Sequence, residues 1–255
     1  MERPLYDTIG TSYSTTRQED PRIARAIREA LGDAESVLNV GAGAGAYEPR
    51  DRRVVAVEPS EVMVAQRPEG AAPVVRGEAE ALPFEDDSFD VAMALMSDHH
   101  WRRRADGLRE LRRVARRRVV LFNADVARWG EFWFSRDYLP AVLDLIPEPY
   151  RRPGHWLEEL STLLGGDLRA TPVPIPHDCR DGFYGAYWRR PRRYLERRVR
   201  DGISVFALVP EGDVATAVAR LRSDLSDGSW HERHGELLER DELDLGYFLV
   251  VAELG

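Results

Sequence analysis

Three alternate glycines and one acidic residue are the part of this sequence best suited to chemistry. The glycines follow a short apolar run at 37–40 and are Gly41, Gly43 and Gly45. Because glycine lacks a Cβ, its backbone adopts positive φ angles and lets a ligand approach closely. Glu58 ends the next apolar run, 53–57, where a carboxylate accepts hydrogen bonds from both hydroxyls of a ribose. We therefore expect a nucleoside-containing cofactor here, in preference to a glycine-rich turn that binds nothing.

The glycine spacing fits two kinds of cofactor. Gly41, Gly43 and Ala46 match a loose form of the dinucleotide pattern, in which a pyrophosphate lies at a helix N-terminus. Glu48 falls in the first turn of the helix expected over 46–50, where its charge would repel a pyrophosphate. S-adenosylmethionine has no phosphate and carries a sulfonium and an ammonium group, so the loop favours it over a dinucleotide.

Short apolar runs and helical patterns alternate in the first half of the chain. The runs are 37–40, 54–57, 74–75, 91–96 and 119–122, and the helical patterns lie near 20–32, 46–50, 60–66 and 103–116. Most runs are continuous, as in strands buried on both faces of a parallel sheet. We expect a doubly wound, Rossmann-like α/β sheet with ligands at the carboxyl ends of its strands.

The second half of the chain is less regular. Residues 126–166 and 177–242 read as mainly helical, a sixth strand is expected over 167–175, and a final strand over 246–252. We interpret the two helical stretches as a cap over the ligand-bearing edge of the sheet. The whole chain, 1–255, is then a single domain with its cofactor-binding core at 1–125.

A block further along the chain resembles a known enzyme family. Gly77-Glu-Ala-Glu-Ala-Leu-Pro-Phe84, followed by residues 85–91, resembles the block after the third strand of class I S-adenosylmethionine-dependent methyltransferases. The likeness is greatest to the small-molecule group that includes the ubiquinone and menaquinone-type enzymes. It covers roughly residues 5–125 and the last strand. It implies S-adenosylmethionine as cofactor and a seven-stranded sheet whose last strand is antiparallel and lies beside the fifth.

The resemblance also implies roles for individual residues. The cofactor-binding positions are Asn39, Gly41, Ala42, Gly43, Gly45, Glu58, Pro59, Glu78, Ala79, Leu95 and Met96. The glycines would support the methionine part of the cofactor, Glu58 would hold the ribose, and Glu78 would accept a hydrogen bond from the adenine amine. Asn39 stands where the family usually has an acid, so it offers the ammonium group no charge. Residues 116–118 replace the usual Pro-Gly-Gly and are expected to form a surface turn.

The N-terminal segment is similar to the gating segment of the same family. Tyr13 and Arg17 are expected to close over the cofactor, with Arg17 pairing with its carboxylate, and Tyr6 is expected to contact the substrate. Simple packing against the domain is the alternative for the tyrosines.

Two histidines follow the fourth expected strand directly, in Asp98-His-His-Trp101. His99 or His100 would lie near the reactive methyl group and could act as a general base, because the pKa of histidine lies near working pH. The alternative is that both only shape the pocket. A metal site formed by the pair with Asp98 is disfavoured because consecutive side chains diverge, so no metal is expected.

Aromatic residues gather in two places in the expected cap. Trp133, Tyr184 and Trp188 are candidates for lining an apolar or aromatic substrate pocket. The alternative is a core packed on the sheet. Residues 177–179 precede the second cluster and would either contribute a polar group to the pocket or cap a helix.

Composition narrows the class of partner. The net charge of −8 disfavours a general nucleic-acid binder, and the 36 basic residues are all arginines. Arginine clusters at 102–118 and 189–200 are interpreted as solvated surfaces, with an anionic substrate or a partner as the alternative for the second. Without an apolar run near 18 residues or a signal-peptide pattern, we expect a cytoplasmic monomer or homodimer with no membrane partner.

These observations favour an enzyme that methylates an O, N or C atom of a small molecule, with a specialised metabolite as the expected substrate. Four other functions stay open at this point. They are a cofactor-binding fold that catalyses a cyclisation or rearrangement, or only binds the cofactor; a dinucleotide oxidoreductase; a non-enzymatic interaction protein; and a nucleic-acid methyltransferase.

Overall fold

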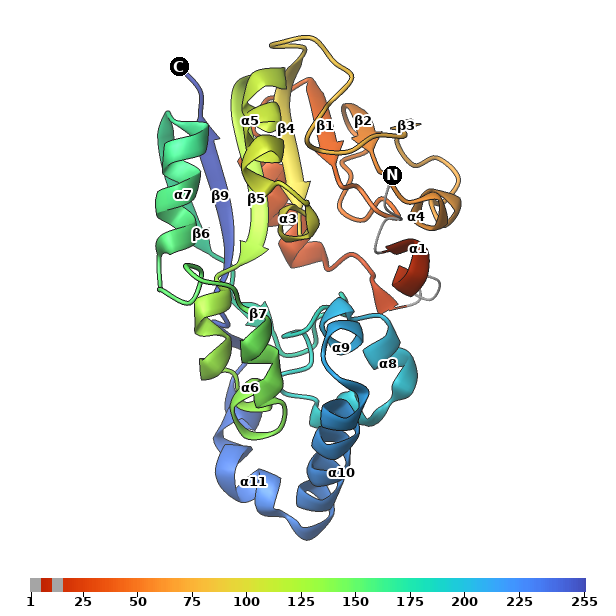
Figure 1. Ribbon diagram of the computed structural model, residues 1–255, viewed down its shortest axis with the longest axis vertical. Helices are drawn as coiled ribbons and strands as arrows, with labels where there is room; N and C mark the ends of the chain where they lie inside the picture. Colours follow the sequence, from red (N-terminus) through yellow and green to blue (C-terminus); the bar gives the residue numbers. More distant parts are fainter. Residues whose placement is uncertain (1–5, 11–15) are drawn as a thin grey trace.

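The computed structural model describes residues 6–10 and 16–255, and within these ranges seven strands form one mixed sheet, ordered β3-β2-β1-β4-β5-β9-β6 (Figure 1). The strands are β1 (Ser36–Val40), β2 (Arg53–Val57), β3 (Val74–Val75), β4 (Phe89–Leu95), β5 (Ala115–Ala124), β6 (Asp167–Pro172) and β9 (Tyr247–Glu253). Strand β9 is antiparallel to both of its neighbours, β5 and β6. The predicted fold class is confirmed, including the antiparallel last strand beside the fifth.

The remaining elements are mostly short. The helices are α1 (Tyr6–Ile9), α3 (Pro21–Leu31), α4 (Glu61–Ala65), α5 (Arg104–Val114), α6 (Trp133–Asp137), α7 (His155–Leu164), α8 (Arg197–Asp201), α9 (Ser204–Leu208), α10 (Glu211–Asp227) and α11 (Ser229–His234). Single 3₁₀ segments are η2 (Asp98–His100), η3 (Val126–Glu131), η4 (Pro140–Leu145), η5 (Pro191–Leu195) and η6 (Gly235–Glu239). A small ladder pairs β7 (Ile175–Pro176) with β8 (Glu242–Leu243). No helix in the described ranges has both the length and the apolar character needed to cross a membrane.

Both faces of the sheet are buried. In β4, Val91 and Met93 belong to one apolar core, whereas Ala92 and Ala94 belong to the other. Helix α3 packs against the first face, and α5 with α7 covers the second. Burial on two sides is why the strands read as continuous apolar runs in the sequence.

Helix α3 begins as its sequence predicts. Asp20 is the N-cap, and its side chain accepts a hydrogen bond from the backbone N–H of Arg22 at 3.0 Å. Pro21 occupies the first helical position, where its fixed φ is already suited to a helix. This helix carries the chain away from the N-terminal segment and into β1.

Four local predictions are wrong. Residues 46–50 form turns and not a helix, and Tyr47 there has a φ of 64°. Residues 116–118 lie within β5 and not in a surface turn. The sixth strand ends at Pro172 instead of continuing to 175, because the chain turns to form the separate ladder of β7. Residues 177–190 form turns and loops where helix was expected.

Figure 1 shows α6 and α8 to α11 together beyond the carboxyl ends of β4 and β5. The core on the α3 face continues into these helices without a break, since Phe122 of β5 and Trp230 of α11 belong to the same cluster of buried residues. This shared core favours interpreting the helical stretches as part of one domain.

Candidate active site

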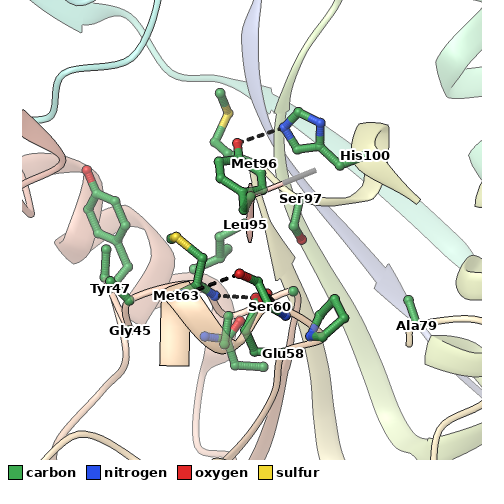
Figure 2. A pocket seen from close by; sticks show the side chains of 18 of the residues that line it. Gly45, Tyr47, Glu58, Ser60, Met63, Ala79, Leu95, Met96, Ser97 and His100 are labelled. Atoms are coloured by element: carbon green, nitrogen blue, oxygen red, sulfur yellow. Dashed lines mark hydrogen bonds between the residues drawn. The ribbon is translucent and has the colours of Figure 1, made fainter. Parts of the chain in front are cut away.

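A cavity of about 690 Å³ opens at the carboxyl ends of β1, β2 and β4 (Figure 2). The predicted cofactor residues that line it are Arg17, Asn39, Gly41, Ala42, Gly43, Gly45, Glu58, Pro59, Glu78, Ala79, Leu95 and Met96. Tyr13 lies outside the described residues. The structure therefore gathers residues from five separate stretches of the sequence around one hollow.

The glycine loop forms a tight turn beneath this cavity. Gly41, Gly43 and Gly45 have φ angles of 69°, 53° and 88°, which other residues rarely adopt. A Cβ on Gly41 would lie 2.6 Å from the Cβ of Ser97. Ser97 is itself fixed, because its hydroxyl donates to the carbonyl of Val40 at 2.8 Å. Glycine at position 41 thus lets the loop after β1 approach the end of β4.

Glu58 presents a buried carboxylate to the cavity, with only 5% of the residue exposed. One carboxylate oxygen accepts the backbone N–H of Gly43 at 2.7 Å, and the other accepts that of Ser60 at 2.9 Å. Burial raises the pKa of Glu58, while these two hydrogen bonds oppose the rise. Each oxygen keeps a further lone pair, so the group can still accept from two vicinal hydroxyls.

Asn39 offers a second acceptor at the floor of the cavity. Its side-chain nitrogen donates to Glu48 at 3.1 Å, but its buried Oδ1 has no hydrogen-bond partner among the described residues. Buried polar atoms without a partner are rare, and this one fits a donor such as an ammonium group. Glu48 forms a buried ion pair with Arg67 at 2.8 Å. Glu48 is therefore neither at a helix N-terminus nor unpaired, which corrects the repulsion of a pyrophosphate inferred from the sequence.

Arg17 lines the cavity, but its guanidinium is engaged elsewhere. Its Nε lies 2.5 Å from Oδ1 of Asp181, and the two side chains are 11% and 1% exposed. The hydroxyl of Tyr47 donates to the same carboxylate at 3.0 Å. The expected pairing of Arg17 with a cofactor carboxylate stays a prediction, since Arg17 also lines the cavity. The Arg17–Asp181 ion pair joins the N-terminal segment to the chain between β7 and η5.

The two candidate bases occupy different environments. His100 lines the cavity (Figure 2), and its Nε2 lies 2.9 Å from the hydroxyl oxygen of Tyr6. Burial lowers the pKa of His100 well below 6.5, so the ring is neutral at neutral pH. His99 does not line the cavity. Desolvation lowers the pKa of His99 as well, with a smaller contribution from the charge of Arg104, although the residue is exposed.

Asp98 has a structural role beside the histidines. It is buried and pairs with Arg104 at 2.8 Å, and Arg104 in turn pairs with Glu159 of α7. Asn123 of β5 donates to the same carboxylate. These contacts fix η2 against its neighbours. Among the described residues, no three His, Cys, Asp or Glu side chains come together in a way that could hold a metal ion.

The predicted substrate residues separate into two groups. Tyr6 lines the cavity, whereas Trp133, Tyr184 and Trp188 are 3%, 5% and 0% exposed and belong to the cap core. Trp133 donates its indole N–H to the carbonyl of Trp188 at 2.9 Å, and the Tyr184 hydroxyl lies 2.9 Å from that of Ser135. Their polar atoms are thus satisfied inside the core. This corrects their interpretation as substrate-binding residues.

Several cavity residues were missed by the sequence analysis. They include Tyr47, Ser60, Met63, Gln66, Ser97, Trp101 and Phe122. Ser97 and Trp101 flank the histidines immediately after β4, so their position at a strand end was an available signal. Met63 and Gln66 come from α4 and the residue after it, and no motif marked them.

Comparison with known proteins agrees with this geometry. The family described as "Methyltransferase domain" matches residues 38–122. A crystal structure from Anabaena variabilis, of a protein described as a methyltransferase from an antibiotic biosynthesis pathway, is 31% identical to this chain. It superposes with a TM-score of 0.84 over 94% of this chain and 99% of its own. The chain belongs to the class I S-adenosylmethionine-dependent methyltransferase family.

More distant relatives of this methyltransferase-family chain provide less information about its function. An uncharacterized methyltransferase-like protein of Schizosaccharomyces pombe is 25% identical over 152 residues, or 56% of this chain and 49% of the relative. The match thus spans about half the length of that protein. The [4+2]-cyclase SpnF is 17% identical with a TM-score of 0.51, covering 98% of this chain and 94% of its own, and shows the fold alone.

Proposed function

We propose that the protein transfers a methyl group from S-adenosylmethionine to a small molecule. The observation that carries this is Glu58, a buried carboxylate that Gly43 and Ser60 hold at the end of β2 with acceptor capacity left toward the cavity. The cavity is large enough for a nucleoside and its amino-acid tail, at about 690 Å³. The small-molecule substrate is supported by the net charge of −8, which disfavours nucleic acid.

Different residues of the cavity suit different parts of the cofactor. Glu58 would bind both ribose hydroxyls, and Asn39 Oδ1 would accept from the ammonium group. Glu78, exposed at the rim, would accept from the adenine amine, with Pro59 and Ala79 beside the ring. Leu95 and Met96 would line the side where the reactive methyl lies. When bound, S-adenosylmethionine supplies an electrophilic methyl group on a sulfonium leaving group.

The chain's own contribution to the reaction is positioning and proton removal. Holding two reactants in line lowers a barrier by up to about 7–11 kcal/mol. His100 is the proposed general base for a nucleophile that must lose a proton. When its Nδ1 carries the ring proton, Nε2 accepts the Tyr6 hydroxyl, so Tyr6 can take a proton from a substrate while passing its own to His100.

Two finer assignments are part of this proposal. The helical stretches 126–166 and 177–242 act as the substrate cap, supported by their shared core with the sheet. Membership of the ubiquinone and menaquinone-type group is supported by the Leu82-Pro-Phe84 block. A cytoplasmic location and a monomeric or homodimeric state stay predictions from composition.

Calorimetric titration tests the cofactor directly. We expect saturable binding of S-adenosylmethionine and S-adenosylhomocysteine, and much weaker or no binding of NAD and NADP. The reason is that the turns at 46–50 provide no helix N-terminus to hold a pyrophosphate. If neither adenosyl compound binds, the proposed function is ruled out, whatever the substrate is.

The role of His100 predicts a particular pH dependence. Because the pKa of His100 lies well below 6.5, activity should fall only as the pH drops through that lowered value, where the ring becomes protonated. We expect His100→Gln to lose about 10²–10⁴-fold in turnover and to lose this acid limb, with S-adenosylhomocysteine affinity retained. The measurement is kcat/KM against pH with a substrate recovered by metabolite pull-down, with His99→Gln as the matched control. Equal losses in the two variants would contradict the assignment.

A second candidate keeps the cofactor but not the methyl transfer. It is favoured by Asn39, whose neutral amide replaces the acid that the family usually has at this position. The fold is compatible with such chemistry, since SpnF is a [4+2]-cyclase. Mass spectrometry separates the candidates, because methyl transfer releases one S-adenosylhomocysteine for each product and a cyclisation releases none.

A further inference from the structure

A second cavity, of about 780 Å³, lies between α1 and the helical cap. It is lined by residues of α8, α9 and α10, and Tyr6 lines both this cavity and the first. Tyr6 is also the residue whose hydroxyl reaches His100. The second cavity therefore adjoins the candidate active site at the side chain proposed to handle the proton.

Part of the lining of the second cavity is apolar. The residues that provide this surface are Ile203, Phe206, Val209, Val214 and Val218. Phe206 and Val209 are 9% and 4% exposed, so they are held firmly by the cap core behind them. A surface of this kind suits the hydrocarbon part of a ligand, because burial of apolar area is favourable.

The same cavity is also lined by three arginines, Arg197 and Arg200 from α8 and Arg222 from α10. Within the described residues Arg222 has no hydrogen bond or ion pair, and Arg200 has no carboxylate within ion-pair distance. Arg200 donates to the carbonyl of Tyr194 at 2.7 Å. Arg197 lies 3.7 Å from Asp201, which, with Glu211, provides the negative charge in the lining.

These cations are close enough to affect one another. Burial lowers the pKa of Arg200, and the neighbouring Arg197 and Arg222 lower it further, against the opposing effect of Asp201. Like charges held together with too few counter-charges are unfavourable, and an anion placed between them relieves the repulsion. Guanidinium groups bind carboxylate and phosphate oxygens in pairs, which makes them well suited to such a ligand.

We propose that the second cavity binds the anionic end, a carboxylate or a phosphate, of an elongated and partly apolar substrate. The apolar body would lie along Phe206 and Val218, and the opposite end would pass Tyr6 to reach His100. This inference rests on the proposed methyl transfer, and it names the class of substrate. A single molecule is favoured over an anionic membrane surface because the site is hollow and the chain as a whole carries a charge of −8.

The test uses simple amphipathic probes, decanoate and decyl phosphate, with neutral 1-decanol for comparison. We expect calorimetry to detect the two anions and to show at least about tenfold weaker binding of decanol. Arg222→Gln should weaken the binding of both anions by about tenfold, and Arg222→Glu should abolish it. Arg192→Gln is the matched control, because Arg192 is exposed on η5, outside the cavity, and should change affinity less than twofold.

Equal affinity for decanoate and decanol would overturn the inference, and so would an equal loss in Arg222→Gln and Arg192→Gln. Charge-dependent sedimentation with phosphatidylglycerol vesicles, in place of binding to the single-chain probes, would also overturn it, because this surface would then be a membrane contact. A parallel titration of S-adenosylhomocysteine separates the two proposals. If S-adenosylhomocysteine binds while the anions do not, only the substrate class is wrong. If the anions bind while S-adenosylhomocysteine does not, the proposed methyl transfer is wrong.

Discussion

Glu58→Gln is expected to weaken the binding of S-adenosylhomocysteine by about 30- to 1,000-fold, because it removes the charge from both hydrogen bonds to the ribose. Such charge-assisted bonds together account for about 2–4 kcal/mol of affinity. In the native protein the backbone N–H groups of Gly43 and Ser60 donate to the two carboxylate oxygens. In the variant, the amide NH₂ group, itself a donor, would face one of these N–H groups. Calorimetric titration of the purified variant measures the effect.

Glu61→Gln is the matched control for this variant. Glu61 lies three residues away on α4, its side chain is 77% exposed, and it pairs with Arg76 outside the cavity. We expect its replacement to leave the affinity within about twofold, since exposed ion pairs contribute little. An unchanged affinity in Glu58→Gln, or equal losses in the two variants, would show that the ribose is held elsewhere.

The same carboxylate makes binding depend on pH. Burial raises the pKa of Glu58 above 4.5, and only the ionised form accepts from both hydroxyls. Affinity for S-adenosylhomocysteine should therefore fall as the pH drops through this raised value, and Glu58→Gln should lack that decrease. For stability the sign is opposite. A carboxyl whose pKa is raised by folding destabilises the fold when ionised, so this penalty is present above the folded-state pKa and disappears as the pH falls.

Asp181→Ala is expected to lower the free energy of unfolding by about 3–5 kcal/mol, because it removes a buried carboxylate that forms an ion pair with the largely buried side chain of Arg17. The carboxylate is 1% exposed and also accepts the hydroxyl of Tyr47 at 3.0 Å, so the variant removes a hydrogen bond of Tyr47 together with the ion pair. Urea denaturation measures the change, with the midpoint falling at constant slope if only stability is affected.

Asp178→Ala provides the comparison within the same loop. Asp178 pairs with Arg22, but its side chain is 59% exposed, so we expect a loss below about 1 kcal/mol. Similar losses in both variants would mean that the Arg17–Asp181 ion pair is no more important than a surface contact. Because Tyr47 belongs to the loop after β1, we also expect Asp181→Ala, but not Asp178→Ala, to weaken S-adenosylhomocysteine binding.

The sheet could be predicted from the sequence because its signals are local. Runs such as Val91–Met96 are apolar on both faces, and this pattern has few explanations other than a strand buried on two sides. The glycines and Glu58 could be placed for the same reason, since each follows a strand directly. The position of a strand fixes the position of the residues that directly follow it. In this topology the carboxyl ends of the parallel strands lie at the same edge of the sheet.

The failures arise where a partner distant in sequence decides the structure. Tyr47 has a positive φ, which interrupts the expected helix, and its hydroxyl donates to Asp181, 134 residues later in the sequence. The same carboxylate forms an ion pair with Arg17, a contact that no signal near Arg17 in the sequence indicated. Trp133 and Trp188 show a different limit: composition does not distinguish an aromatic pocket from an aromatic core, and only packing decides.

The position of β9 has a consequence for how the chain reaches this structure. Strand β9 lies between β5 and β6, yet it comes after both in sequence, and more than a hundred residues separate it from β5. During synthesis β5 is made early and keeps an unpaired edge, and β6 has no place in the sheet until β9 emerges. The cap helices between β6 and β9 must therefore be produced while the sheet is open. Completing the sheet then requires the closure of long loops, which predicts slow folding and a need for protection of the β5 edge in the meantime.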